Sequence, residues 1–324
     1  MGEDSSSGQF GSGLAVDRPV LLTGALGQLG LALQALCPAD QPLRAFSRSQ
    51  LDIADHSSVA ATFSQVKPLL VIYAAAYTAV DRAESEPEAA HRANVLGPQV
   101  LAEQCAAHGA RLIHVSTDFV FDGRANRPYG TDAPTAPLGV YGLTKLQGED
   151  AVAACLDDHV ILRTGWVYSH RGSNFFQTML RLHCERELLK VVVDQVGTPT
   201  RAESLAWAIW QFAHRPALQG VYHWSDSGVC SWYDFAVAIG QFAVREGLIA
   251  RAAEVQPINA EEYPTPAARP HYSVLDKKKT WEALGAGARH WQEELALAIA
   301  SAHADQHSSD VRAPIEAPIE EQHG

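Results

Sequence analysis

The chain has 324 residues, 47% hydrophobic and 19% charged, so it is long enough for a large core and for two packed subdomains. Its formal net charge of −12 argues against nucleic acid as a partner, because nucleic-acid binders usually present a basic surface. No apolar run approaches the ~20 residues that cross a bilayer, and the scattered cysteines favour a reducing cytoplasm over a disulfide framework or a zinc site. We therefore expect a globular cytoplasmic protein with no membrane partner.

Both ends of the chain are polar and lack an amphipathic pattern. Residues 1–17 are rich in Gly and Ser, and residues 304–324 are polar and acidic with an imperfect API-E repeat. Neither segment carries enough apolar surface to offset the entropy lost on ordering, so we predict that both are disordered. The first segment also lacks the basic region and apolar run of a secretory signal.

Between these ends, short runs rich in Val, Leu and Ile alternate with segments of helical pattern. In chain order we expect strand 19–23, helix 30–36, strands 43–46 and 69–73, helix 87–107, strand 111–115, helix 141–154 and strand 160–163. Continuous apolar strands separated by helices are typical of parallel βαβ units with both sheet faces covered. Because such crossovers are right-handed, we predict an α/β fold, a doubly wound parallel Rossmann-type sheet, over residues 18–172.

After residue 172 the alternation loosens. Helical patterns occur at 174–186, 232–246 and 276–300, and a Pro-rich stretch occupies 257–270. We predict a smaller, mainly substrate-binding domain over residues 173–303. Its boundary is soft, because the apolar runs near 191–193 and 221–224 could return to the main sheet.

The first expected strand runs directly into a glycine-rich turn. Gly24, Gly27 and Gly30 form the pattern G-x-x-G-x-x-G at a strand-to-helix junction. Glycines there allow a tight turn and a close backbone approach to a pyrophosphate at the positive end of the helix. Ordinary turns use the same residues, but the position right after an N-terminal apolar strand favours a dinucleotide site.

The second expected strand ends with Ser47 and Arg48, where binders of NAD usually place an acidic residue for the ribose hydroxyls. A guanidinium and hydroxyls suit a 2′-phosphate, so we predict NADPH as the cofactor, with NADH as the alternative. The competing interpretation of Arg48 is an ordinary solvated side chain. Asp52 follows closely and could contact the adenine side. The small residues 74–76 come where a dinucleotide would cross the sheet, although small residues also suit helix packing.

Tyr141 and Lys145 open a later expected helix and share one of its faces, since they are spaced i, i+4. A phenol has a pKa near ~10 and is a poor acid at neutral pH. A neighbouring ammonium lowers that pKa, which is the tuning that a proton donor to a ketone needs. The pair is also common on surface helices. Here it follows the strand end Ser116–Asp118, and ligands of open α/β sheets bind at such ends.

Together these strings resemble the extended short-chain dehydrogenase/reductase superfamily and, within it, the dTDP-4-dehydrorhamnose reductase family. The likeness runs from about Pro19 to about Leu297. Besides the glycine turn, it is carried by LDI (51–53), AAAYTAVD (74–81), STDFVF (116–121), YGLTK (141–145), RTGWVY (163–168), DQVGTPT (194–200) and YPTPAARP (263–270). So many ordered strings make chance similarity implausible.

The resemblance implies reduction of the C4 ketone of dTDP-4-dehydro-β-L-rhamnose. Tyr141 would protonate the C4 oxygen, Lys145 would lower the pKa of Tyr141 and hold the cofactor ribose, and Thr117 would hydrogen-bond the substrate. Further substrate contacts are implied for Asp118, Trp166 and Arg269, the last with a structural contact as an equal alternative. The cofactor contacts expected from the resemblance and the patterns above are Gly24, Gly27, Gln28, Leu29, Gly30, Ser47, Arg48, Asp52, Ile53, Ala74, Ala75, Ala76, Tyr141 and Lys145. Some relatives carry Asp where this chain has Ser47, which again favours NADPH.

Other readings stay open. Another nucleotide-sugar 4-ketoreductase or epimerase of the superfamily is one, whereas a 4,6-dehydratase would resemble T-D-E where this chain has Thr117-Asp118-Phe119. A noncatalytic NADP-binding subunit, similar to the regulatory subunit of methionine adenosyltransferase, is the alternative of a different class, and the presence of Tyr141 and Lys145 opposes it. No metal site is predicted, because the histidines are scattered. A homodimer is compatible with the sequence but not indicated by it.

Overall fold

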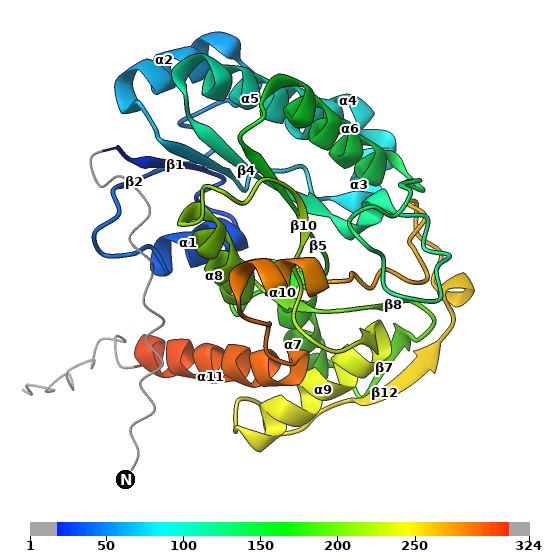
Figure 1. Cartoon of the computed structure of the whole chain (residues 1–324). Coiled ribbons are helices and arrows are strands. Elements are labelled where there is room, and N and C mark those ends of the chain that lie inside the picture. The colour runs from blue at the N-terminus through cyan, green and yellow to red at the C-terminus, as the bar shows by residue number, and fades with distance from the viewer. Residues whose placement is uncertain (1–17, 311–324) are drawn as a thin grey trace, which may run out of the picture.

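The computed structural model describes residues 18–310 (Figure 1). The predictions of disorder for residues 1–17 and for 311–324 lie outside the described residues. The strands are β1 (Val20–Thr23), β2 (Leu43–Phe46), β3 (Leu70–Tyr73), β4 (Arg111–Thr117), β5 (His159–Thr164), β6 (Val167–Tyr168), β7 (Leu188–Val192), β8 (Val196–Gly197), β9 (Thr200–Arg201), β10 (Gly220–His223), β11 (Cys230–Ser231) and β12 (Glu254–Ile258). The α-helices are α1 (Gln28–Ala35), α2 (His56–Val66), α3 (Val80–Ser85), α4 (Pro87–His91), α5 (Gly97–His108), α6 (Val140–Cys155), α7 (Phe175–Glu185), α8 (Ala202–Ala213), α9 (Trp232–Arg245), α10 (Lys278–Leu284) and α11 (Trp291–Asp310).

A six-stranded parallel sheet in the order β10-β5-β4-β3-β1-β2 forms the centre of the molecule. The chain leaves β1 toward β2 on one side and continues from β3 to β4 on the other, which is the strand order of a doubly wound fold. The predicted fold class is confirmed. The carboxyl ends of β1 and β3 are in register, with Thr23 opposite Tyr73, and ligands of such sheets bind in the crevice where the strand order reverses.

Helices cover both faces of the sheet (Figure 1). Leu21, Val71 and Leu112 pack under α2, α5 and α6, whereas alternate residues of the same strands face α1, α8 and α10. This alternation follows from the two-residue period of a strand, and it explains why the strands are apolar throughout. The crevice at the carboxyl ends of β1 and β3 therefore lies in a sheet whose two faces are both packed against helices.

A smaller unit packs below the sheet and has its own core. Helices α7, α9 and α11 enclose it together with the parallel pair β7–β12. The apolar run near 221–224 returns to the main sheet as β10, next to β5, whereas the run near 191–193 joins β12 instead. Helix α8 also packs on the main sheet, so the chain crosses between the two units several times rather than once near residue 172.

The C-terminal helical pattern departs from the prediction in two ways. The segment expected as a helix over 276–300 is divided at Gly285, which ends α10 in the left-handed conformation with φ of +69°. Helix α11 then runs on to Asp310, so the prediction of disorder from residue 304 is wrong for 304–310. The physical reason is tertiary: Leu295, Ile299 and Ala302 are buried in the core of the smaller unit, and this packing stabilises the helix.

The helix expected over 87–107 is interrupted by a π-helical segment, Arg92–Leu96, between α4 and α5. Pro98 has no amide hydrogen, so the carbonyl of Asn94 loses its usual partner four residues on. Helix α6 approaches this point closely, because a Cβ at Gly148 would collide with the Asn94 carbonyl oxygen. The irregular segment is thus packed against the helix that carries Tyr141 and Lys145.

Candidate functional site

The glycine turn is held against the loop that follows β3. Gly24 has φ of +76°, and a Cβ there would lie 2.7 Å from the carbonyl oxygen of Ala74. A Cβ at Gly30 would collide with the carbonyl of Gly24. Gly27 is the N-cap of α1 and offers no capping side chain, so the amides of the first helical turn have no side-chain partner. Those free amides fit the pyrophosphate of a dinucleotide.

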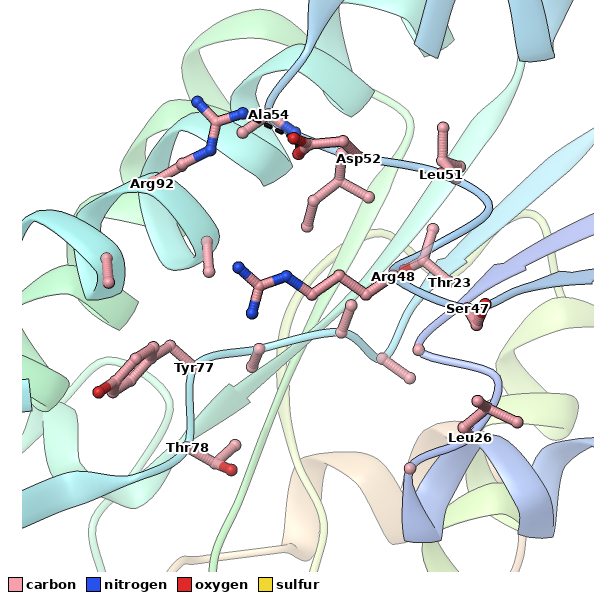
Figure 2. Close-up of a pocket in the computed structure, with 18 of the residues that line it drawn as sticks. Thr23, Leu26, Ser47, Arg48, Leu51, Asp52, Ala54, Tyr77, Thr78 and Arg92 are labelled. Carbon is pink, nitrogen blue, oxygen red and sulfur yellow. Dashed lines mark hydrogen bonds and ion pairs between the residues drawn. The ribbon is translucent and has the colours of Figure 1, made fainter. Parts of the chain in front are cut away.

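A cavity of about 620 Å³ opens beside this turn, between the end of β2 and the segment after β3 (Figure 2). Most of the predicted cofactor residues line it: Gly24, Gly27, Ser47, Arg48, Asp52, Ile53, Ala74, Ala75 and Ala76. Gln28, Leu29 and Gly30 do not, and neither do Tyr141 and Lys145. Leu29 is buried in the core, and the Gln28 amide donates to the carbonyl of Val167 at 3.0 Å. The side chains of Gln28 and Leu29 are therefore engaged elsewhere in the protein.

Arg48 points into this cavity from the end of β2 (Figure 2). Among residues 18–310 its guanidinium has no hydrogen-bond or ion-pair partner, so the positive charge is available to an anionic ligand. The Ser47 hydroxyl is already engaged, since it donates to Gln50 Oε1 at 2.9 Å and lies 3.0 Å from the Ser49 hydroxyl. Of these two neighbours, Arg48 therefore keeps a charged group free toward the cavity, whereas the hydrogen bonds of Ser47 shape the loop.

Several lining residues were not predicted from the sequence. Arg92 reaches Asp52 at 2.7 Å, and this ion pair holds the pKa of the Asp52 carboxyl below its usual value. Tyr77 donates to Glu86 at 2.6 Å from the loop after β3. Leu26, in the glycine turn itself, is 75% exposed. Leu26 is an apolar residue inside the glycine pattern, so the sequence alone could have marked it as a residue exposed by the tight turn.

The second group of predicted residues meets at the carboxyl end of β4. Lys145 is 1% exposed, and its ammonium donates to the carbonyl of Val115 at 2.7 Å. Phe119 packs edge-on against the Tyr141 ring, with 5.5 Å between the ring centroids. The Thr117 hydroxyl donates to Asp118 at 3.1 Å and lies near enough to the Tyr141 phenol to favour its ionised form. The structure therefore brings Thr117, Tyr141 and Lys145 together, as expected.

The electrostatics of this group differ from the expectation. Burial raises the pKa of Tyr141 to about 12, although the nearby Thr117 hydroxyl opposes the shift. Burial also lowers the pKa of Lys145 to about 8, against the opposing charge of Glu149. The Tyr141 pKa therefore lies above its usual value rather than below it as predicted, because loss of solvation outweighs the polar contacts. A phenol with this pKa keeps its proton at neutral pH and is a weaker acid than a tyrosine in water.

Asp118 is 2% exposed, and its Oδ1 accepts a hydrogen bond from Thr117 at 3.1 Å. Its Oδ2 makes no hydrogen bond of ordinary length among the described residues, and burial raises the pKa of this carboxyl to about 6 against the opposing effect of the nearby Ser273 hydroxyl. A Cβ at Gly165 would lie 2.5 Å from that same oxygen, so the Asp118 carboxyl occupies the space that a side chain at position 165 would need. An orphaned buried oxygen of this kind suits a hydroxyl-bearing ligand.

Trp166 lies at the junction of the two units, with a backbone φ of +51° that is unusual for a non-glycine residue. Its ring is stacked on Trp232 of α9, with 3.5 Å between centroids and planes 5° apart. A Cβ at Gly197 would lie 2.6 Å from the Trp166 ring, so the small residue makes room for the indole. The implied sugar contact of Trp166 stays a prediction, with one face of the ring already covered by Trp232.

Arg269 is held by Asp81 of α3, with two hydrogen bonds of 2.7 and 2.9 Å. It also donates to Thr265 within its own loop. These contacts tie the Pro-rich loop to α3 and favour the structural alternative over the implied substrate contact.

Helix α3 also supports the helix that carries Tyr141. The N-cap of α6, Gly139, has no capping side chain, and Glu84 of α3 accepts the hydrogen bond of the Val140 amide at 2.9 Å. A Cβ at Gly139 would lie 2.5 Å from the same carboxylate oxygen. Capping by a residue so far away in sequence leaves no local pattern, and we did not predict it.

His303 and His307 have the spacing HxxxH, which we did not single out among the other, scattered histidines. Their rings lie on α11 with 4.3 Å between centroids. Within residues 18–310, no group of three or more His, Cys, Asp or Glu side chains is arranged to hold a metal. Nor does any helix in this range have the length and apolar character needed to cross a membrane.

Comparisons with known proteins agree with one another over most of the described chain. Residues 18–304 match the family model of the RmlD substrate binding domain. The dTDP-4-dehydrorhamnose reductase of Sinorhizobium fredii (strain NBRC 101917 / NGR234) is 42% identical over 278 residues, which cover 84% of this chain and 93% of that protein. The crystal structure of a dTDP-4-dehydrorhamnose reductase from Clostridium acetobutylicum ATCC 824 is 38% identical, with a TM-score of 0.83, covering 88% of this chain and 99% of that one. That of Bacillus anthracis str. Ames, in complex with NADP, is 35% identical at the same TM-score of 0.83 and the same coverage, 88% and 99%.

Proposed function

Because this chain belongs to the dTDP-4-dehydrorhamnose reductase family, we propose that it reduces the C4 ketone of dTDP-4-dehydro-β-L-rhamnose, with NADPH, to dTDP-β-L-rhamnose. One observation carries the proposal. Tyr141 and Lys145 lie on one face of α6, next to Thr117 at the end of β4. The cavity beside the glycine turn opens at the carboxyl end of the same sheet. A proton donor and a dinucleotide site at the same edge of the sheet are what reduction of a ketone needs.

NADPH supplies the hydride when it is bound. The chain's residues fit such a group: the free amides at the start of α1 suit its pyrophosphate, and Arg48 suits its 2′-phosphate. Tyr141 holds a proton at neutral pH and gives it to the C4 oxygen, while Thr117 keeps the phenol oriented. The free oxygen of Asp118 accepts a hydrogen bond from a sugar hydroxyl.

The direct test supplies the purified protein with NADPH and the 4-keto sugar and follows the absorbance of NADPH. We expect NADPH oxidation that requires the sugar, with the product identified by NMR. An epimerase would interconvert sugars without net NADPH consumption. A regulatory subunit would bind the dinucleotide and turn nothing over.

The Tyr141→Phe variant tests the assigned proton donor. Loss of a positioned acid costs about 10²–10⁴ in rate, so we expect kcat to fall by that factor while NADPH binding, measured by fluorescence, is unchanged. Leu143→Ala, an exposed change on the same helix, is the control and should keep its rate. A Tyr141→Phe enzyme with full rate would contradict the role.

The remaining assignments rest on the sequence and the family. We propose the dTDP sugar and NADPH as the small-molecule partners and no nucleic-acid partner. A homodimer and a cytoplasmic location are further proposals, tested by light scattering of the purified chain and by fractionation of cells that produce it. The domain division is tested by limited proteolysis.

A further inference from the structure

Glu149 lies one helical turn beyond Lys145 on α6 and is 3% exposed. Its carboxylate binds the Arg163 guanidinium of β5 through both oxygens, with distances of 2.6 to 3.1 Å. It also accepts a hydrogen bond of 2.5 Å from the Ser116 hydroxyl at the end of β4. One buried carboxylate therefore joins α6, β4 and β5. Glu149 was not singled out from the sequence, and Ser116 and Arg163 were named there only as parts of longer strings.

The surroundings of Lys145 contain little other negative charge. Its ammonium donates to the Val115 carbonyl, and it lies 5.7 Å from the centroid of the Tyr73 ring on β3. The remaining titratable groups that face it are His114 of β4, Tyr141 of its own helix and Arg163, which lies beyond the Glu149 carboxylate. Burial and the Lys145 charge hold the pKa of His114 well below its usual value, and burial raises the pKa values of Tyr73 and Tyr141, so these three groups are neutral. Glu149 is the one anion among these neighbours.

We propose that Glu149 is a positioning residue that keeps Lys145 protonated and fixes the helix of Tyr141 to the strand end that carries Thr117. The inference rests on the proposed function only in that Lys145 serves that reaction. A buried ammonium without a nearby anion loses its proton readily, since desolvation disfavours the charged form. The carboxylate opposes this loss. Because Ser116 directly precedes Thr117, the same contact holds the Thr117 hydroxyl in place relative to α6.

The charge of Lys145 can be measured without cofactor or substrate. Lysine labelled with ¹³C at Cε gives a signal that moves as the ammonium titrates, and the chain holds few lysines, so Lys145→Arg assigns the signal. We expect Glu149→Gln to move the titration of Lys145 down by about one pH unit or more. Glu149→Asp keeps the charge and should restore most of the shift. The basic limb of the kcat–pH profile should move to lower pH together with the titration.

Glu294→Gln is the matched control. Glu294 is 5% exposed and also pairs with an arginine, Arg201 at 3.2 Å, but it lies on α11 in the smaller unit. If Glu149→Gln alone fails to fold, Glu149→Gln combined with Arg163→Met removes the buried pair as a whole, a change that is often tolerated. The double variant removes one negative and one positive charge near Lys145, so it should lower the titration of Lys145 by less than Glu149→Gln does.

An unchanged Lys145 titration in a folded Glu149→Gln variant, or a raised one in the double variant, would overturn the inference, as would an equal shift in Glu294→Gln. These outcomes are separate from failure of the proposed function. If the wild-type protein does not consume NADPH with the 4-keto sugar, the reduction is refuted. A lowered Lys145 titration in the variant would still establish that Glu149 holds the charge.

Discussion

At the scale of single residues, the site depends on groups whose charge is set by burial. Tyr141 keeps its proton and Lys145 holds its charge less firmly than a lysine in water. Arg48 is different, because it stands in an open cavity without a protein partner among residues 18–310. Each group can be tested by a substitution whose effect has a defined sign.

Replacing Arg48 tests the choice of cofactor. We expect Arg48→Ala to weaken NADPH binding about tenfold or more, the loss of one charge-assisted contact, while NADH binding changes little. Arg44→Ala, an exposed arginine on the same strand that does not line the cavity, is the control. Dissociation constants from fluorescence titration decide the matter. A wild-type preference for NADH of tenfold or greater would refute the argument from Arg48.

Asp118 gives a prediction for stability against pH. Burial raises its pKa from 3.8 to about 6, so the folded state binds this proton more tightly than the unfolded state. The stability that this proton contributes is complete below pH 3.8 and is lost as the pH rises to about 6. Asp118→Asn keeps a neutral group, so its stability relative to the wild type should increase between pH 4.5 and 7.5 in urea unfolding.

Asp122 is the control for that experiment, because its shift has the opposite sign. A hydrogen bond from Tyr129 lowers the pKa of Asp122, so the stability that its charge contributes is present above pH 3.8 and is lost as the pH falls below it. Asp122→Asn should therefore be less stable than the wild type by a constant amount between pH 4.5 and 7.5. If Asp118→Asn also showed a constant difference over this range, the burial argument for Asp118 would fail.

At the scale of elements, the position of α6 depends on its neighbours more than on its own sequence. Its N-cap is a glycine, and the missing cap comes from Glu84 of α3. The π-helical segment before α5 packs against Gly148 in the middle of α6. Both contacts fix the helix that carries Tyr141 and Lys145.

Removing the remote cap should lower both stability and rate. A lost N-cap costs about 0.5–2 kcal/mol, so we expect Glu84→Ala to lower the free energy of unfolding by about that amount and to reduce kcat with little change in NADPH binding. Glu84→Gln keeps an acceptor oxygen and should recover most of both. Glu88→Ala on the neighbouring α4 is the control. Equal effects of Glu84→Ala and Glu88→Ala would show that the cap does not act on the site.

At the scale of the whole molecule, the site lies where the sheet meets the smaller unit. Gln28 of α1 donates to the Val167 carbonyl, and Trp166 of the neighbouring segment is stacked on Trp232 of α9. Asn174 at the start of α7 also donates to the Gln28 side chain at 3.3 Å, so contacts between the two units lie directly beside the glycine turn. The indole of Trp166 packs with the core of the smaller unit.

Removing the aromatic partner tests whether this junction serves the substrate. Aromatic pairs contribute about 0.5–1.5 kcal/mol beyond their buried area, so Trp232→Ala should raise the KM for the dTDP sugar about two- to tenfold and leave the affinity for NADPH unchanged. Phe242→Ala is the control, since Phe242 lies on the same helix but packs against Arg245 instead. If the affinity for NADPH fell while the KM for the sugar rose, Trp166 would belong to the cofactor site instead.

The sequence by itself determined the parallel α/β fold, the glycine turn and the joint placement of Thr117, Tyr141 and Lys145. Apolar strands, glycine spacing and the i, i+4 pair are local patterns, and each has one favourable backbone solution. The family resemblance is confirmed by the matching relatives.

Only the tertiary structure decided what depends on contacts between distant segments. The cap of α6 by Glu84, the tie between Arg269 and Asp81, the pairing of β7 with β12 and the buried group of Ser116, Glu149 and Arg163 join residues far apart in the chain. The extent of α11 and the raised pKa of Tyr141 follow from burial, which is a property of the packed molecule. Solvation and long-range packing are set only once all elements are in place, so no local pattern contains them.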